Sequence, residues 1–114
     1  MYHTQMELAR QGVITDKMEA AAAAANIPAE ELRQNIADGT AIICHNNRRS
    51  HVTPLAVGKG ICTRVNANIG TSKDDTSIEN ELHKARVAEA AGADAIMDLS
   101  TGGPIDEIRQ AVLA

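Results

Sequence analysis

The chain has 114 residues, a net charge of −4 and 44% hydrophobic residues, but aromatic residues make up only 1% and Tyr2 is the single ring. This length fits one small domain or a slice of a larger one, and the alanine-rich apolar content argues against a self-sufficient sandwich or barrel. Basic residues are dispersed and no apolar stretch approaches about eighteen residues, so nucleic-acid and membrane partners are not expected. Two cysteines without a secretory leader predict a cytoplasmic protein with free thiols.

Residues 1–60 are predicted to form an N-terminal helical segment with a short strand and a loop. Thr15 is a good N-cap, because its hydroxyl can accept a backbone N–H, and Pro28 suits the first turn of a helix. The polar stretch from Cys44 to Gly60 is predicted to be an irregular loop. The expected elements are helices over 3–10, 16–25 and 28–37 and a strand over 41–43.

Residues 61–114 alternate between strand and helix patterns. Thr76 to Glu79 matches a capping box, and the apolar stripe that follows at helical spacing ends at Gly92. The polar side of this helix carries Glu81, Lys84 and Glu89. The other expected elements are strands over 63–69 and 93–99 and a second helix through Ile105, Ile108 and Val112. Strand, helix, strand and helix at roughly thirty residues per unit is the length of a βαβ unit.

A helix that connects two strands makes the strands parallel, so their carboxyl ends lie at the same edge of the sheet, where α/β proteins bind ligands. Asn66 and Asn68 share one strand face and could hold either a polar ligand or a loop. Met97 could belong to the core or pack on a flat ligand, and Asp98 could act as a base or cap the following helix. Thr101-Gly102-Gly103 could form an anion nest.

The predicted loop carries several side chains whose roles the sequence leaves open. Cys44, His45 and His51 suggest zinc, but an adjacent Cys and His are poorly placed for one tetrahedral centre, so no metal site is predicted. The Arg48-Arg49 pair makes a small cationic patch that could meet a phosphate or be solvated. Cys44 and Cys62 lack a CxxC spacing, so a redox role is not expected.

Several stretches, which together cover nearly the whole chain, share the motifs of one family. They are Thr4 to Met6, Ala9 to Thr15, Met18-Glu19, Gly39 to Ile43, Val65 to Ser72, Ala91 to Asp94 and Met97 to Gly102. The most specific part is the pair Asn-Ala-Asn-Ile-Gly over 66–70 and Met-Asp-Leu-Ser-Thr-Gly over 97–102. On these motifs the chain resembles the N-terminal portion of the phosphomethylpyrimidine synthases of thiamine biosynthesis.

The resemblance implies an α/β fold in which N-terminal helices are followed by the first βαβα units of a (β/α)8 barrel, incomplete in this chain. It also implies a radical S-adenosylmethionine lyase that converts 5-aminoimidazole ribonucleotide to 4-amino-5-hydroxymethyl-2-methylpyrimidine phosphate. The implied cofactors are a 4Fe–4S cluster, S-adenosylmethionine and a zinc ion, whose ligands are absent from this chain. The full-length protein is expected to be a homodimer.

Two binding residues carry over from the family: Asn68 as a polar neighbour of the ribonucleotide and Met97 as an apolar one. The catalytic residues stay unknown. The chain departs from the family over residues 44–49, where the usual Pro-Ala-Asn-Ile-Asn-His is replaced and only Asn46 keeps its place. This departure leaves a sister group open as an alternative, the anaerobic 5-hydroxybenzimidazole synthases, which use the same substrate to make a cobamide lower ligand.

The family's cysteine triad, spaced Cys-x2-Cys-x4-Cys, has no counterpart among the two cysteines of this sequence. Because a 4Fe–4S cluster of this class needs three thiolates, the 114-residue chain is expected to be inactive alone. A truncated, non-catalytic module that binds a ligand is the second alternative.

Overall fold

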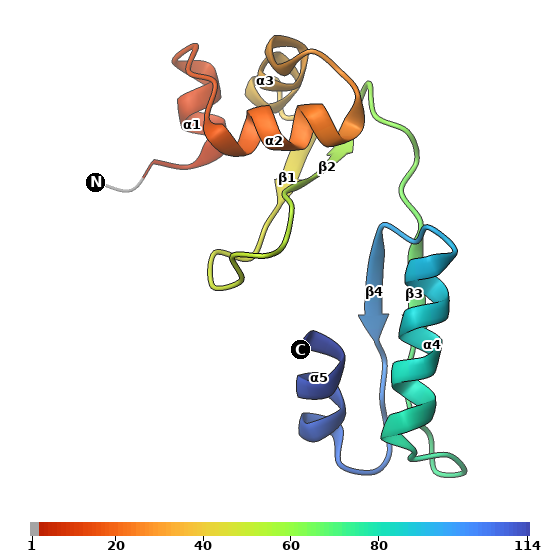
Figure 1. Ribbon diagram of the computed structural model, residues 1–114. Coiled ribbons are helices and arrows are strands. Elements are labelled where there is room, and N and C mark those ends of the chain that lie inside the picture. The colour runs from red at the N-terminus through yellow and green to blue at the C-terminus, as the bar shows by residue number, and fades with distance from the viewer. Residues whose placement is uncertain (1–2) are drawn as a thin grey trace. The chain divides into compact units, whose positions relative to one another are not determined.

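A computed structural model describes residues 3–114, which fall into two compact units. The first unit extends to Thr63 and the second runs from Arg64 to Ala114. The first unit contains α1 (Gln5–Arg10), α2 (Asp16–Ala25), α3 (Ala29–Ala37), β1 (Ala41–Cys44) and β2 (Leu55–Gly58). The second contains β3 (Asn66–Ile69), α4 (Ile78–Ala90), β4 (Ala95–Asp98) and α5 (Ile105–Leu113) (Figure 1).

The helices of the first unit begin at the signals that the sequence contains. Thr15 caps α2 by accepting the backbone N–H of Met18 at 3.2 Å, as predicted. Thr4 caps α1 through a capping box with Glu7, whose carboxylate accepts the Thr4 backbone N–H at 2.7 Å. Asn26 ends α2 in the left-handed conformation, with φ of 56°. The predicted helices are therefore confirmed, with starts displaced by one or two residues in α1 and α3.

The predicted irregular loop over 44–60 is wrong in its last part, which contains β2. This strand pairs antiparallel with β1, so that Ile43 lies opposite Ala56. The sequence pattern for this strand is weak, because its apolar run is only Leu55 to Val57 and lies between Pro54 and Gly58. The remaining part of the loop extends away from the three helices at the tip of the hairpin (Figure 1).

The first unit has a continuous apolar core. Leu32 of α3 and Met18 of α2 are its largest fully buried side chains. Small residues fill the space between them, so the alanine-rich composition suits close packing of helices on a hairpin. The buried residues of this core are Ala9, Met18, Ala21, Ala22, Leu32, Ile36, Ala41 and Ala56.

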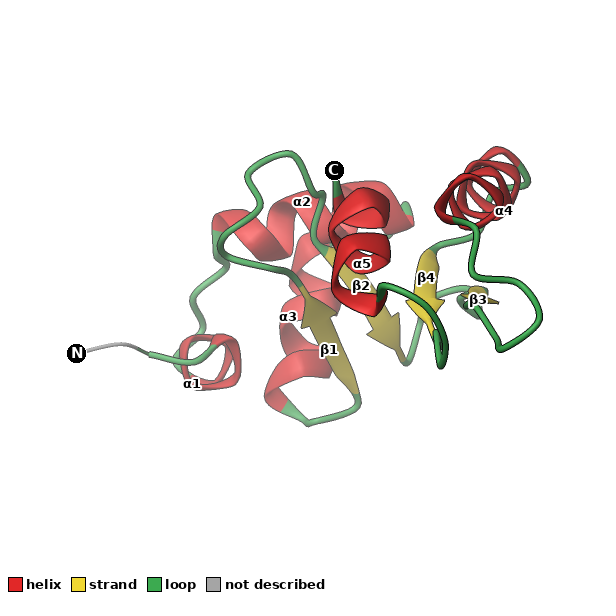
Figure 2. Cartoon of the chain, turned by 90° about the horizontal axis from the view of Figure 1, so that it is seen from below, coloured by secondary structure: helices red, strands yellow, loops and turns green. Residues whose placement is uncertain are grey.

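The second unit is the predicted strand–helix–strand–helix arrangement, and its two strands are parallel as predicted. Helix α4 packs against both β3 and α5 (Figure 1 and Figure 2). Both strands are shorter than expected. Before Asn66 the Val65 carbonyl accepts the backbone N–H groups of both Asp94 and Ala95, at 2.9 and 3.2 Å, and a side chain also holds this segment. Asp94 accepts the Val65 backbone N–H at 2.8 Å and pairs with Arg64 at 2.9 Å.

The predicted capping box at Thr76 and Glu79 is wrong. Ser77 is the N-cap of α4, and its hydroxyl accepts the Asn80 backbone N–H at 3.2 Å. The cap moves by one residue because Asp75 accepts the Ser77 backbone N–H at 2.9 Å and so fixes Ser77 in an extended conformation ahead of the helix. The predicted terminator is confirmed, since Gly92 follows α4 with φ of 87°.

The fold is thus a mixture of helices and two small sheets, consistent with the predicted α/β class. Two parallel strands do not by themselves establish a (β/α)8 barrel, and that part of the expectation stays a prediction. Within residues 3–114, no helix is long and apolar enough to cross a bilayer.

Candidate functional site

The carboxyl ends of β3 and β4 bring the two predicted binding residues together. Asn68 and Met97 are direct partners in the parallel register. Paired residues of neighbouring parallel strands point to the same face, and here both side chains are exposed, Met97 to 48%. An amide and a thioether therefore lie side by side on one open face of the sheet. Their predicted role in binding a ribonucleotide stays a prediction.

The face that carries Asn68 follows from the alternation along β3. Asn66 and Asn68 are exposed, whereas Ala67 is half-buried and Ile69 is buried. Asn66 donates its amide to the Asn68 side-chain oxygen at 3.4 Å, a long hydrogen bond that leaves both amides able to engage a ligand. The predicted sharing of one strand face by these two residues is confirmed.

The loops that follow β3 and β4 are joined to each other by hydrogen bonds. Thr71, which is buried, donates its hydroxyl to the Gly102 carbonyl at 2.6 Å and its backbone N–H to the Ser100 hydroxyl at 3.1 Å. In return, the Thr101 backbone N–H donates to the Thr71 carbonyl at 3.0 Å. These hydrogen bonds join residues about thirty positions apart in the sequence. The two loops at the edge that carries Asn68 and Met97 are therefore fixed relative to each other.

Contacts at this edge argue against two of the alternatives left open there. Asp98 does not cap α5, because its carboxylate accepts the backbone N–H and hydroxyl of Ser100 at 2.9 and 2.5 Å, and α5 has no side-chain cap at Pro104. The anion-nest interpretation of Thr101-Gly102-Gly103 loses one of its donors, since the Thr101 N–H is already used by Thr71.

Glu81 is the residue that sequence reasoning misplaced. Helical periodicity put it on the solvated side of α4, but its side chain is 0% exposed. One carboxylate oxygen accepts the Gly70 backbone N–H at 2.8 Å, and the other pairs with the ammonium of Lys84. Lys84 in turn reaches the Gly70 carbonyl at 3.4 Å. The sequence signals this contact only indirectly. The Gly70 N–H follows the end of β3 and has no hydrogen-bond partner in the sheet, so it needs one elsewhere.

The loop between β3 and α4 carries a carboxylate with a shifted pKa. The Ser77 backbone N–H, and after it the Asn80 side-chain amide at 3.0 Å, stabilise the ionised Asp75 and lower its pKa below the ordinary value. Asp75 also accepts the Ser72 backbone N–H through its own carbonyl at 2.9 Å. The carboxylate and the main-chain carbonyl of Asp75 together order the loop that leads from Asn68 into α4.

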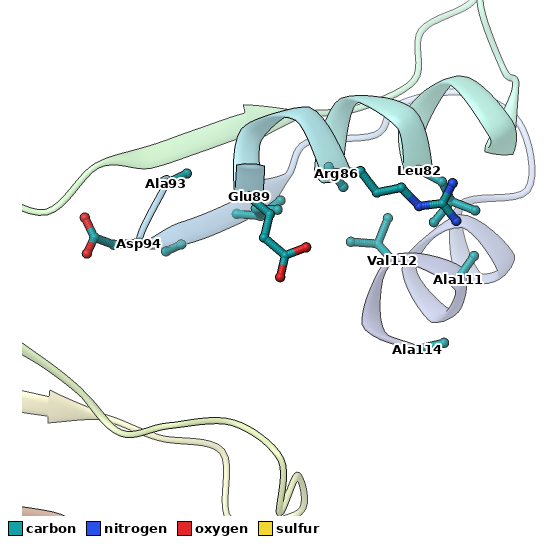
Figure 3. A pocket seen from close by; sticks show the side chains of 11 residues that line it. Leu82, Arg86, Glu89, Ala93, Asp94, Ala111, Val112 and Ala114 are labelled. Carbon is teal, nitrogen blue, oxygen red and sulfur yellow. The ribbon is translucent and has the colours of Figure 1, made fainter. Parts of the chain in front are cut away.

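Two hollows flank the second unit. One, of about 370 Å³, runs along β3 and α4 and is lined by Asn68, His83 and Lys84 among others. The other, of about 430 Å³, lies between α4, the start of β4 and the end of α5 (Figure 3). Arg86 and Glu89 line the second hollow, which lies at the amino end of β4 and so away from the edge with Met97.

The hairpin residues with open roles do not form a metal site in the part of the chain that the structure describes. Cys44 and Cys62 are exposed and free, as predicted. The His45 Nδ1 atom lies 3.4 Å from the Asn47 side-chain oxygen. A guanidinium nitrogen of Arg49 lies 3.0 Å from His51 Nε2. No group of three His, Cys, Asp or Glu side chains among residues 3–114 could hold a metal ion.

Comparisons with known proteins place these motifs in one family. The model of the radical SAM ThiC family matches residues 4–114. A "Phosphomethylpyrimidine synthase 2" of Syntrophotalea carbinolica is 75% identical over 97% of this chain, and a "Phosphomethylpyrimidine synthase" of Geobacter metallireducens is 64% identical over 100% of it. A protein of the same name from Thermococcus kodakarensis is 51% identical over 96% of the chain. The chain spans only 26% of the length of each of these relatives. The resemblance found from the motifs is confirmed.

Proposed function

The chain belongs to the radical SAM ThiC family, and from this premise we propose that the whole protein is a phosphomethylpyrimidine synthase. In this proposal it converts 5-aminoimidazole ribonucleotide to 4-amino-5-hydroxymethyl-2-methylpyrimidine phosphate, a lyase reaction of thiamine biosynthesis. The observation that carries the proposal is the 75% identity, over 97% of this chain, to a protein named phosphomethylpyrimidine synthase 2. The register pairing of Asn68 with Met97 at the sheet edge supports it. The benzimidazole alternative is supported by none of these relatives' names.

The fold proposal is that the second unit begins a (β/α)8 barrel. Its parallel strands and two helices have the order of such a barrel, and large apolar side chains such as Ile96 and Leu99 are exposed on it. Exposed apolar groups on an incomplete sheet are what further strands and helices of a barrel would cover. Barrel enzymes bind their substrates at the carboxyl ends of the strands, where Asn68 and Met97 lie.

In the substrate proposal, Asn68 and Met97 recognise different parts of the ribonucleotide. The Asn68 amide can donate and accept hydrogen bonds at once, which suits the hydroxyl and amine groups of the substrate. The Met97 thioether is apolar and polarisable, which suits contact with the flat imidazole ring. Because the two side chains emerge from adjacent strands on one face, a single ligand can touch both.

The cofactors of the proposed reaction do not fit the residues of this chain. A 4Fe–4S cluster needs three thiolates, and the sequence has two cysteines, of which Cys44 ends β1 and Cys62 lies outside any element. We place the cluster, S-adenosylmethionine and zinc on other parts of the whole protein, which we propose to be a cytoplasmic homodimer without nucleic-acid or membrane partners. The 114-residue chain by itself is then inactive.

The substrate proposal is tested by Asn68→Ala in the full-length protein. Loss of a buried hydrogen bond to the ribonucleotide should weaken its binding by about 1–3 kcal/mol, measured by titration calorimetry with 5-aminoimidazole ribonucleotide. Gln110→Ala, which removes an exposed amide from α5, is the matched control and should bind as the wild type does. Unchanged affinity in Asn68→Ala would show that this amide does not contact the substrate.

The reaction is tested by identifying the product of the full-length, cluster-loaded protein. The proposal requires the phosphorylated pyrimidine. A benzimidazole product would assign the protein to the sister activity, and a protein that binds the ribonucleotide without turning it over would favour the non-catalytic module.

A further inference from the structure

We propose that Glu81 is a positioning residue for the ribonucleotide site, acting through the backbone of Gly70; the inference rests on the proposed binding roles of Asn68 and Met97. Glu81 touches neither of these side chains in any contact described above. It acts on the loop that holds them, because α4 presents its carboxylate to the point where the chain leaves β3.

Gly70 is held by two side chains of α4. Both backbone polar groups of this residue meet side chains of α4: its N–H donates to Glu81 at 2.8 Å, and its carbonyl lies 3.4 Å from the Lys84 ammonium. Glu81 and Lys84 also pair with each other. The two side chains, one turn apart on α4, therefore fix both the N–H and the carbonyl of Gly70.

Burying the Glu81 carboxylate costs free energy. Removing a carboxylate from water is expensive, and an ion pair with one partly exposed partner compensates only part of that cost. A buried ion pair is for this reason weak support for a purely stabilising role. A fixed geometry at Gly70 is what the carboxylate provides and what an apolar side chain at position 81 would not.

Gly70 connects Glu81 to the strand ends that carry the binding residues. Asn68 lies two residues before Gly70, and Met97 lies two residues before Leu99 on the neighbouring strand. At Gly70 the two chains approach so closely that a Cβ would lie 2.6 Å from the Leu99 carbonyl carbon and 2.7 Å from the Ser100 nitrogen. The Leu99 backbone N–H donates to the Ile69 carbonyl at 2.8 Å just before this contact. Displacement of Gly70 would thus move both strand ends.

The experiment uses the full-length protein and its affinity for 5-aminoimidazole ribonucleotide. Glu81→Ala removes the acceptor for the Gly70 N–H, whereas Glu81→Gln keeps an oxygen acceptor there and loses the charge together with the ion pair to Lys84. We expect Glu81→Ala to bind about tenfold more weakly and Glu81→Gln to stay within about threefold of the wild type. Glu79→Gln, at an exposed position of the same helix, is the matched control and should change neither affinity nor the melting temperature.

A double-mutant cycle separates positioning from general stability. If Glu81 acts through the strand end that carries Asn68, the losses in affinity of Glu81→Ala and Asn68→Ala should be less than additive. A lower melting temperature with unchanged affinity of the folded fraction would overturn the inference and leave Glu81 a structural residue. Where Glu81→Ala does not fold, Glu81→Asp takes its place, since its shorter side chain cannot reach Gly70 in the same geometry.

The outcomes also distinguish this inference from the proposed function. Weaker binding in Asn68→Ala together with wild-type binding in Glu81→Ala would overturn the positioning role alone. Wild-type binding in Asn68→Ala would overturn the proposed substrate contact and the positioning role with it.

Discussion

Each of the two units is stabilised internally by a different kind of interaction. The first unit packs three helices on a hairpin around a continuous apolar core with Leu32 and Met18 at its centre. In the second unit, Ile69 and Ile108 are the buried apolar residues among those described, while Glu81 and Thr71 are buried with them. Its strand ends are joined by side-chain hydrogen bonds instead of apolar packing.

The difference teaches where a binding edge can be placed. Apolar burial is non-directional, so it stabilises a unit without orienting polar groups toward a ligand. Hydrogen bonds have strict geometry, and a network of them fixes loops at the cost of burying polar groups. The unit with the larger core carries none of the proposed binding residues, and the unit with the polar network carries both.

The sharpest test of the comparison is a cavity in the first core. Leu32→Ala should destabilise the first unit by about 2–5 kcal/mol, because a fully buried side chain is lost and the packed helices close the space incompletely. Native-state hydrogen exchange of the amides of α1 to α3 measures the loss. Leu99→Ala, at an exposed leucine of the second unit, is the control, and its effect should be small. Equal effects of the two changes would contradict the assignment of the apolar core to the first unit.

A smaller effect is expected from a methyl group at the contact of the two strand ends. Gly70→Ala and Gly12→Ala both place a side chain at a positive φ, but only Gly70 has backbone atoms of another segment within 3 Å of the added carbon. Gly70→Ala should therefore cost about 1–3 kcal/mol more than Gly12→Ala.

Hydrogen exchange in α4 and α2, respectively, measures the two costs. Similar losses of protection would show that the loops of the second unit separate easily, and that hydrogen bonds do not hold this edge closely packed.

The smallest expected effect is on the response to acid, and it should be similar in the two units. The backbone N–H and then the hydroxyl of Thr4 lower the pKa of Glu7, and the Ser77 backbone N–H, followed by the Asn80 amide, lowers the pKa of Asp75. A pKa that is lower in the folded state stabilises the fold above the unfolded pKa, and this contribution is lost as the pH falls from the unfolded pKa through the folded one.

Carbon-detected NMR titration of the carboxyl groups measures both midpoints. The free energy of unfolding of Glu7→Gln and Asp75→Asn should depend less on pH in this range than that of the wild type. A midpoint at or above the ordinary value for either carboxylate would contradict the hydrogen bonds described for it.

Much of the fold was predictable because its signals are local. The Thr15 cap, the Gly92 terminator and the alternation of Asn66 and Asn68 each depend on a few neighbouring residues. The candidate edge was predictable for a second reason, since a connecting helix leaves two strands little choice but to run parallel. The rule and the expected strands over 63–69 and 93–99 predicted only the shared edge, and the exact pairing of Asn68 with Met97 came from the structure.

The errors lie where a contact that the expected pattern did not include competes with it. The pattern around Thr76 and Glu79 satisfies a capping box, but Asp75 moves the cap to Ser77. Strand β2 is weak in its own composition and exists because β1 lies beside it. Helical periodicity places Glu81 on the polar side of α4. Its side chain is nevertheless buried, because it accepts the hydrogen bond of the Gly70 N–H.

The amino-acid sequence by itself determined the order of helices and strands apart from β2, the family, and the two residues that lie at the shared sheet edge. Caps, glycines, periodicity and motif spacing act over a few positions, so they can be read without knowing what the chain packs against. Only the tertiary structure decided which polar groups are buried and what they hold, as for Glu81, Thr71 and Asp98. Burial and hydrogen-bond partners depend on residues that are far away along the chain, and folding alone brings these together.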